Sequence, residues 1–143
     1  MLNRDIILKK AERIGALVQE TQGWTDAAWS DVAGNTALIR ACERNLEIMV
    51  ELASDINALI VLEKTGRTPD SYKESFRALR PLGILEEELS EILVDSVELR
   101  NILVHEYDFE ADNEQFFRSL KDALLPAYDQ YVRAVVRFME KES

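Results

Sequence analysis

The stretch RNILVHEY, residues 100–107, holds the side chains of this chain whose types could do chemistry. Arg100 carries a permanent positive charge on a planar fork of N–H donors, which can bind a phosphate at two points. His105 is the only histidine of the chain, and an imidazole takes up and releases protons near neutral pH. Asn101 and Tyr107 add an amide and a phenol to the same stretch. The question is whether Arg100 and His105 are incidental polar residues or the working parts of a site.

Each of these side chains also has an ordinary structural explanation. An arginine on an apolar helix face is commonly paired with an acid across a helix bundle. Suitable acids lie earlier in the chain at Glu43, Glu47, Glu51 and Asp55. A lone histidine is commonly a surface or packing residue, and a tyrosine at a helix end commonly packs its ring and leaves its hydroxyl in water.

Residues 85–107 are expected to form a helix whose core-facing stripe includes Arg100. At about 100° per residue, the rest of the stripe is Leu89, Ile92, Leu93, Ser96, Leu103, Val104 and Tyr107. A guanidinium on a buried face keeps its proton, so it needs an acceptor or must reach the rim of the bundle. Asn101 and His105 share a second face with Val94, and we expect this face to meet a partner helix.

The apolar spacing in the remainder of the chain is also helical, without strand patterns or internal repeats. It predicts further helices over residues 2–22, from near 34–36 to about 63, over 71–80, and from about 112 to the C-terminal end. Ser71 and Glu74 have the spacing of a capping box, and Pro126 is expected to kink the last helix. Residues 1–143 are therefore predicted to form one all-α domain, an up-and-down four-helix bundle with an additional short helix.

Composition limits the classes of function. With 143 residues, 47% of them hydrophobic, the chain can form a full core without staples. One cysteine, Cys42, and one histidine cannot build a disulfide or a structural zinc site, so we expect no metal and no cofactor. The N-terminal stretch is not of signal-peptide type, and no apolar run approaches the roughly 20 residues of a membrane span, so we expect a cytoplasmic protein. The net charge of −10 argues against broad adhesion to nucleic acid but allows a locally basic site.

The order Arg-Asn-four residues-His-x-Tyr, closing a helix in an all-α protein of this length, resembles the HEPN superfamily. More closely, it is similar to the HepT-like toxins that pair with minimal nucleotidyltransferases. Their signature is an arginine, a polar residue, a short apolar spacer and a histidine, and the HepT branch adds a tyrosine two residues later. The four positions are filled here by Arg100, Asn101, His105 and Tyr107. The helix order, the Arg40-x-x-x-Arg44 pair and the proline-bearing loop before the motif helix extend the resemblance over nearly the whole chain.

The resemblance implies a metal-independent endoribonuclease toxin that acts as a symmetric homodimer, with the RNA site between the two motif helices. Arg100 would then bind the phosphate and His105 would transfer a proton, with Asn101 in a supporting role. The resemblance also implies that a minimal nucleotidyltransferase antitoxin silences the toxin by transferring AMP to Tyr107. Arg40 and Arg44 are further candidates for RNA contacts.

Two other functions remain open. With the same fold and partner, the chain could be a non-catalytic, substrate-binding helical subunit of a minimal nucleotidyltransferase. It could also be an interaction bundle in which RNILVHEY only packs. The pairing of Arg100 with His105 favours the enzyme, because a pure adaptor has no need of an imidazole at that place.

Overall fold

The computed structural model describes residues 3–105 and 113–142, and for residues 104 and 105 it describes the backbone alone. These residues form seven α-helices and one π-helical segment, without a strand. The long helices are α1 Arg4–Thr25, α3 Thr36–Thr65, α5 Glu87–His105 and α7 Leu125–Lys141. The short elements are α2 Trp29–Val32, α4 Tyr72–Arg77, α6 Asn113–Ser119 and the π-helical η1 Leu120–Leu124.

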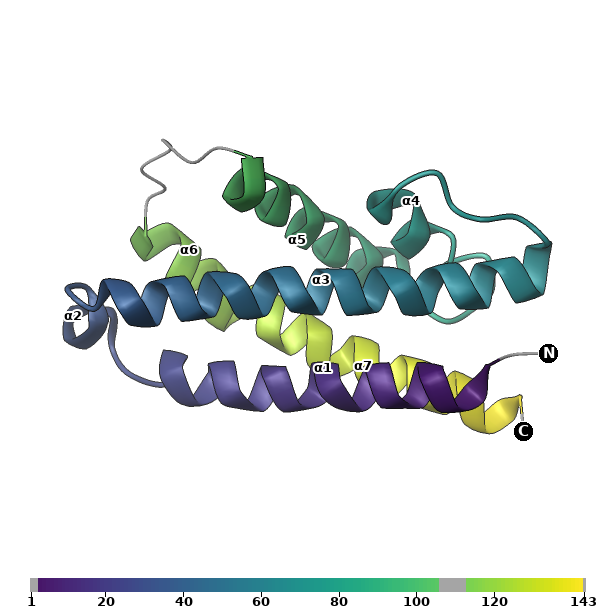
Figure 1. Ribbon diagram of the computed structural model, residues 1–143, viewed down its shortest axis with the longest axis horizontal. Helices are drawn as coiled ribbons and strands as arrows, with labels where there is room; N and C mark the ends of the chain where they lie inside the picture. The colour runs from purple at the N-terminus through teal and green to yellow at the C-terminus, as the bar shows by residue number, and fades with distance from the viewer. Residues whose placement is uncertain (1–2, 106–112, 143) are drawn as a thin grey trace.

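The four long helices run alternately in opposite directions, as Figure 1 shows. Helix α1 packs on α3 and α7, and α5 packs on the same two helices, so the four form a closed ring around one core. The short helix α4 lies on α3 and α5. The predicted all-α, up-and-down four-helix bundle with an additional short helix is confirmed. Helix α2 was not predicted.

Helix ends follow local chemistry. Asn35 caps α3 by accepting a hydrogen bond from the Leu38 N–H at 3.1 Å, and Gly66, at φ 75°, ends that helix in the left-handed conformation. Ser71 caps α4, because its hydroxyl accepts from the Glu74 N–H at 3.1 Å. The predicted cap is therefore present on the serine side, while the Glu74 carboxylate pairs with Arg77.

The last long helix changes its winding at Pro126. Helices α6, η1 and α7 follow one another without a break, and the π-helical η1 ends one residue before α7 reaches the proline. Proline has no N–H to donate, and its ring crowds the carbonyl four residues earlier in a regular α-helix. A π-helical turn is wider, so it accommodates the proline while the two helical stretches continue.

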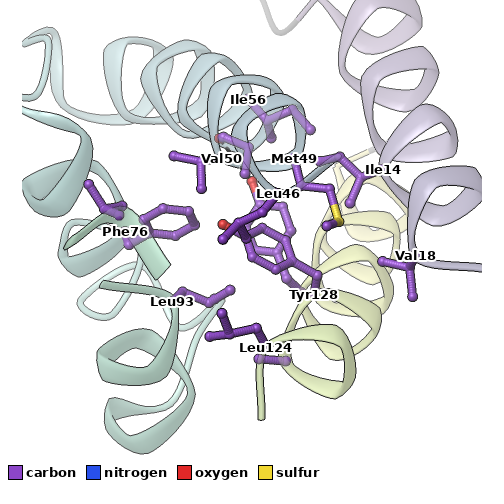
Figure 2. Packing of buried hydrophobic residues seen from close by; sticks show 14 of the residues in the cluster. Ile14, Val18, Leu46, Met49, Val50, Ile56, Phe76, Leu93, Leu124 and Tyr128 are labelled. Carbon is purple, nitrogen blue, oxygen red and sulfur yellow. Dashed lines mark hydrogen bonds between the residues drawn. The ribbon is translucent and has the colours of Figure 1, made fainter. Parts of the chain in front are cut away.

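The core lies between the four long helices and extends beneath α4. In Figure 2, Phe76 of α4 and Leu93 of α5 point toward Tyr128 of α7 and the apolar side chains of α3. Cys42 is buried in this core, as predicted, and burial, followed by the charge of Glu43, raises the pKa of its thiol to about 11.

More of the circumference of helix α5 is buried than the predicted core-facing stripe. Leu93 and Ser96 are fully buried as expected, but Val94 and Val97 are buried as well. Val94 was placed on a second face that would meet a partner helix, and for this residue that expectation is wrong. Val94 instead belongs to the hydrophobic core of this chain.

Candidate functional site

Arg100 extends from α5 toward α3 and α4 and is mostly buried, with 17% of its side chain exposed. Its Nη2 lies 3.5 Å from Glu51 Oε1 on α3, and its Nη1 donates to Asn101 Oδ1 at 3.2 Å. The guanidinium carbon lies 5.4 Å from the ring centroid of Tyr72, the first residue of α4. Of the four acids proposed from the sequence as partners, Glu51 is the one that Arg100 meets.

The hydrogen-bonding capacity of Arg100 is poorly used. Its buried Nε has no hydrogen-bond partner among the described residues, and the contact to Glu51 is at the outer limit of a hydrogen bond. The Ser54 hydroxyl is the other buried side-chain atom of the described residues without a partner, but it is neutral, and an unmade bond costs more for a charged group. Arg100 is thus a buried cation held by weak contacts, with donor capacity to spare.

Asn101 stands beside Arg100 with its amide in a defined orientation. Because arginine only donates, the amide oxygen must face the guanidinium, and Nδ2 points away from it. Among the described side chains, none accepts a hydrogen bond from Nδ2. Asn101 also lies beside Tyr72 and Lys73 of α4.

Arg40 and Arg44 lie on the exposed surface of α3 and do not contact Arg100. Arg40 is paired with Glu43, and Arg44 with Glu47 at 3.0 Å. Burial raises the pKa of the Glu43 carboxyl, and the nearby Arg40 charge opposes this rise. Arg44 is seven residues before Glu51, about 10 Å along the helix axis. Both arginines are thus held in local ion pairs on the N-terminal half of α3. The C-terminal end of α5 lies over the same half of α3 (Figure 1).

His105 is the last residue of α5 that the structure describes, and it is described by its backbone alone. Its backbone continues the helix of Arg100, so the two Cα atoms are about 7.5 Å apart along the axis and about 140° apart around it. Tyr107 lies outside the described residues. The structure therefore brings Arg100 and Asn101 together and places His105 next along the same helix.

Salt bridges tie α4 to the start and middle of α5. Lys73 pairs with Glu98 at 2.8 Å, and Arg77 pairs with Glu91 at 3.3 Å. The Lys73 ammonium, through its hydrogen bond and then its charge, lowers the pKa of the exposed Glu98 carboxyl. Such exposed pairs contribute little to stability, but they neutralise the positive charges of α4 near Arg100.

Sequence reasoning missed Tyr72 as a neighbour of Arg100. The tyrosine precedes the arginine by 28 positions in the sequence, and only the packing of α4 on α5 brings the two together. An aromatic residue directly after the Ser71 cap, in a helix too short to bury both of its faces, is a weak sequence signal for such a position.

The described residues contain no group of three or more His, Cys, Asp or Glu side chains that could hold a metal ion. None of their helices has the length and apolar content that a membrane crossing requires.

The all-helical bundle and the order of Arg100, Asn101 and His105 along α5 fit the resemblance to the HEPN superfamily. The model of the family described as "Ribonuclease HepT-like" matches residues 7–135, and the chain belongs to this family. The predicted family is therefore confirmed.

Known relatives agree with this assignment. A protein of Archaeoglobus fulgidus that is provisionally named an RNase is 39% identical over 98 residues, 67% of this chain and 73% of the relative. The tRNA nuclease HepT of Aphanizomenon flos-aquae is 31% identical over 135 residues, 94% of this chain and 90% of the relative. Among solved structures, the tri-AMPylated Shewanella oneidensis HEPN toxin in complex with MNT antitoxin superimposes with a TM-score of 0.82. It is 25% identical to this chain, and the match covers 93% of this chain and 98% of the toxin.

Proposed function

We propose that Arg100 and His105 are the residues with which this HepT-like ribonuclease cleaves RNA, and that Asn101 supports them. The observation that carries the proposal is the state of Arg100. It is a mostly buried cation on the motif helix, with an unpaired Nε among the described residues and a weak contact to Glu51. A phosphate offers the acceptors that this guanidinium lacks.

RNA supplies its own nucleophile in the 2′-hydroxyl. In the proposed reaction the 2′-oxygen attacks the adjacent phosphorus, its proton passes to the His105 imidazole, and the bond from phosphorus to the 5′-oxygen breaks. The products are a 2′,3′-cyclic phosphate and a 5′-hydroxyl. Arg100 binds the phosphate and stabilises the charge that develops on it, and Asn101 orients the phosphate or the imidazole. Positioned proton transfer of this kind accelerates a reaction by roughly 10²–10⁴-fold.

The protonation of the leaving 5′-oxygen needs a second proton donor. Each chain has one histidine, so we propose that the protein works as a homodimer in which His105 of the partner subunit, or water, fills this role. The angle of about 140° between Arg100 and His105 around α5 supports a shared groove, since two copies of the helix can bring both kinds of side chain to one phosphate.

We further propose that a minimal nucleotidyltransferase silences the toxin by transferring AMP to Tyr107. The solved relative from Shewanella oneidensis is an AMPylated toxin bound to its antitoxin. Tyr107 follows the motif histidine by two positions, and an AMP group there would add a bulky anion near Arg100. That anion would occupy the place of the RNA phosphate and repel the rest of the strand. Arg40 and Arg44 are retained as candidate RNA contacts, on the condition that RNA phosphates displace Glu43 and Glu47.

The test of the site is RNA cleavage by the purified protein in the presence of EDTA, with transfer RNA as the first substrate. Wild type is expected to leave 2′,3′-cyclic phosphate ends, and Arg100→Ala and His105→Ala are each expected to lose at least 100-fold in rate, about the effect of one positioned catalytic group. Arg133→Ala is the matched control, because Arg133 is an exposed arginine of α7 paired with Asp129. If both site variants cut as fast as wild type, the assignment of Arg100 and His105 is wrong.

A mixing experiment tests the shared groove. Arg100→Ala and His105→Ala subunits are expressed together, so that mixed dimers form. If Arg100 of one subunit acts with His105 of the other and water protonates the leaving oxygen, each mixed dimer keeps one intact Arg100–His105 pair, and activity returns to a sizeable fraction of wild type. If the mixture stays as inactive as either variant, either the two residues act within one subunit or the reaction requires His105 of both subunits. If the protein is a monomer at assay concentration, the dimer proposal fails.

Co-expression with a nucleotidyltransferase encoded beside this chain tests the silencing. The expected result is a mass increase of one or more AMP units on the peptide that holds Tyr107, together with loss of cleavage. Partner binding by a protein that neither cuts RNA nor slows growth would instead support the adaptor function.

A further inference from the structure

A pocket of about 330 Å³ opens between α4 and α5, directly beside Arg100. Its lining residues are Ser71, Tyr72, Lys73, Val97 and Asn101. Val97 is 2% exposed and forms an apolar floor. Asn101 lies one turn further along the same face of α5, so the pocket adjoins the proposed phosphate site.

Tyr72 gives the pocket an aromatic wall. It is 39% exposed, one of three large hydrophobic side chains of the described residues that remain so accessible. Its ring also lies against the Arg100 guanidinium. The same side chain therefore contacts the proposed phosphate-binding residue and lines the pocket beside it.

Buried contacts beneath α4 hold the backbone that carries this ring. Ser75 is 2% exposed, and its hydroxyl donates to the Tyr72 carbonyl oxygen at 2.6 Å. The same hydroxyl accepts from Asn57 Nδ2 of α3 at 3.1 Å. Phe76, which is fully buried, anchors the helix in the core. Tyr72 is thus an exposed aromatic residue on a rigid support, which lowers the entropic cost of binding a flat ligand.

The polar groups of the pocket fit a neutral ligand better than a second phosphate. The ammonium of Lys73 is already paired with Glu98. Asn101 lines the pocket, and its amide nitrogen is a hydrogen-bond donor, since its amide oxygen faces the Arg100 guanidinium. An apolar floor, an aromatic wall and an amide donor suit a flat heteroaromatic ring with a hydrogen-bond acceptor on its edge.

We propose that this pocket binds a nucleobase of the RNA, from a nucleoside bonded to the phosphate that Arg100 holds. The base stacks on Tyr72 and accepts a hydrogen bond from Asn101 Nδ2. This inference rests on the proposed function, because Arg100 has to hold a phosphate of the same strand. Its consequence is that the ribonuclease requires an unpaired, splayed nucleotide next to the cleaved bond, since a base in a duplex cannot enter a side pocket.

The test compares intact and abasic RNA. A single-stranded oligoribonucleotide with one cleavage site is prepared in a series in which one nucleotide at a time lacks its base. Wild type is expected to lose roughly 5- to 150-fold in kcat/KM at one position beside the cleaved bond, the range for one lost base stack. Tyr72→Leu is expected to lose a similar factor on intact RNA but to cut that one abasic substrate as fast as wild type does.

Two further variants separate stacking from other effects. Tyr72→Phe keeps the ring and is expected to keep the preference for intact over abasic substrate. Ile6→Ala removes an exposed apolar side chain from α1 and serves as the control that leaves kcat/KM unchanged. If Tyr72→Leu loses equally on intact and abasic RNA, Tyr72 acts on Arg100 or on the fold, and the pocket proposal is wrong. If the abasic series is flat for wild type, the proposal is also wrong.

A binding measurement keeps the pocket testable if the proposed catalysis fails. An RNA with 2′-O-methyl sugars throughout cannot be cut through its 2′-hydroxyls, and a 2-aminopurine at the sensitive position, or at each position in turn, reports stacking by loss of fluorescence. Quenching by wild type and Tyr72→Phe, but not by Tyr72→Leu, supports the pocket even if His105→Ala cuts RNA normally. Absence of quenching by wild type at every position overturns it.

Discussion

Two polar side chains one turn apart on α5 have opposite environments. The Ser96 hydroxyl is fully buried, donates to the Leu93 carbonyl oxygen at 2.5 Å and shares a hydrogen bond of 2.7 Å with the Tyr128 hydroxyl. Arg100 has a buried Nε without a partner among the described residues, and its nearest acid lies at 3.5 Å. The first is a fully paired polar group, and the second is a cation with unused donors.

The comparison distinguishes polar groups that hold the bundle from polar groups that bind a ligand. The Ser96 pair belongs to the packing between α5 and α7, and a second buried set, in which Tyr131 donates to Asn57 at 2.6 Å, joins α7 to α3. A buried polar group that serves stability is normally paired in this way, because an unmade bond is costly. The incomplete pairing of Arg100 supports the proposal that a phosphate completes its contacts.

The largest expected effects come from removing each of the two side chains, Arg100 and Ser96, in turn. Arg100→Ala is expected to lower RNA cleavage by roughly 10²–10³-fold, the cost of one lost charge-stabilising donor. Its free energy of unfolding is expected to change by less than about 1 kcal/mol, since the lost contact to Glu51 is weak. Ser96→Ala is expected to do the reverse, with a loss of about 1–3 kcal/mol in stability from the unpaired Tyr128 hydroxyl and cleavage close to wild type.

Urea unfolding and kcat/KM of the same preparations measure both quantities. A result in which Arg100→Ala unfolds as easily as Ser96→Ala while still cutting RNA would remove the basis for treating the two regions differently.

The next largest effect is a difference in stability loss between phenylalanine substitutions of the two buried tyrosines. Tyr131→Phe is expected to cost about 1–3 kcal/mol, because it leaves the buried Asn57 Oδ1 without its donor. Tyr128→Phe is expected to cost less, about 0.5–1.5 kcal/mol, because Ser96 keeps its bond to the Leu93 carbonyl. Urea midpoints of the two variants measure the difference. Equal midpoints would mean that the polar pairs contribute to stability only through packing.

The sequence predicts the bundle and the acid partner of Arg100 better than it predicts the surroundings of Arg100 on α4. Apolar spacing at three and four residues predicts the bundle, and an arginine in an apolar stripe predicts an acid partner, which is Glu51 on α3. The place of α4 could not be predicted in this way, because a helical wheel of α5 shows two apolar flanks and not which of them a six-residue helix covers. The contact of Tyr72 with Arg100 follows from that placement.

Alkaline pH is expected to lower the stability of the fold. Burial raises the pKa of both Tyr128 and Tyr131, with the Tyr128 charge as the second cause at Tyr131. Unfolded tyrosine releases its proton near pH 10, so above that pH the unfolded state holds fewer protons than the folded state and stability falls. Burial raises the pKa of the Cys42 thiol from 9.0 to about 11, so this thiol adds to the loss of stability between pH 9 and pH 11.

Free energies of unfolding from pH 8 to pH 11 are expected to be flat at first and then to decline, with a smaller decline for Tyr131→Phe. Arg100→Ala serves as the control and is expected to keep the wild-type slope. Constant wild-type stability up to pH 11 would contradict the raised pKa of the two phenols.

The smallest expected effect concerns the weak partner of Arg100. The Glu51 carboxylate is 43% exposed and competes with a phosphate for the guanidinium. Glu51→Gln keeps an oxygen that can accept from Nη2 but removes the negative charge, so RNA affinity is expected to rise by up to roughly fivefold at low salt, the scale of one half-exposed ion pair. The gain is expected to shrink as salt screens the charge. Asp129→Asn removes one charge from α7 and is the matched control, expected to change affinity much less. If Glu51→Gln instead weakens RNA binding, Glu51 holds Arg100 in position for the RNA. The guanidinium would then have fewer free donors than the comparison with Ser96 implies.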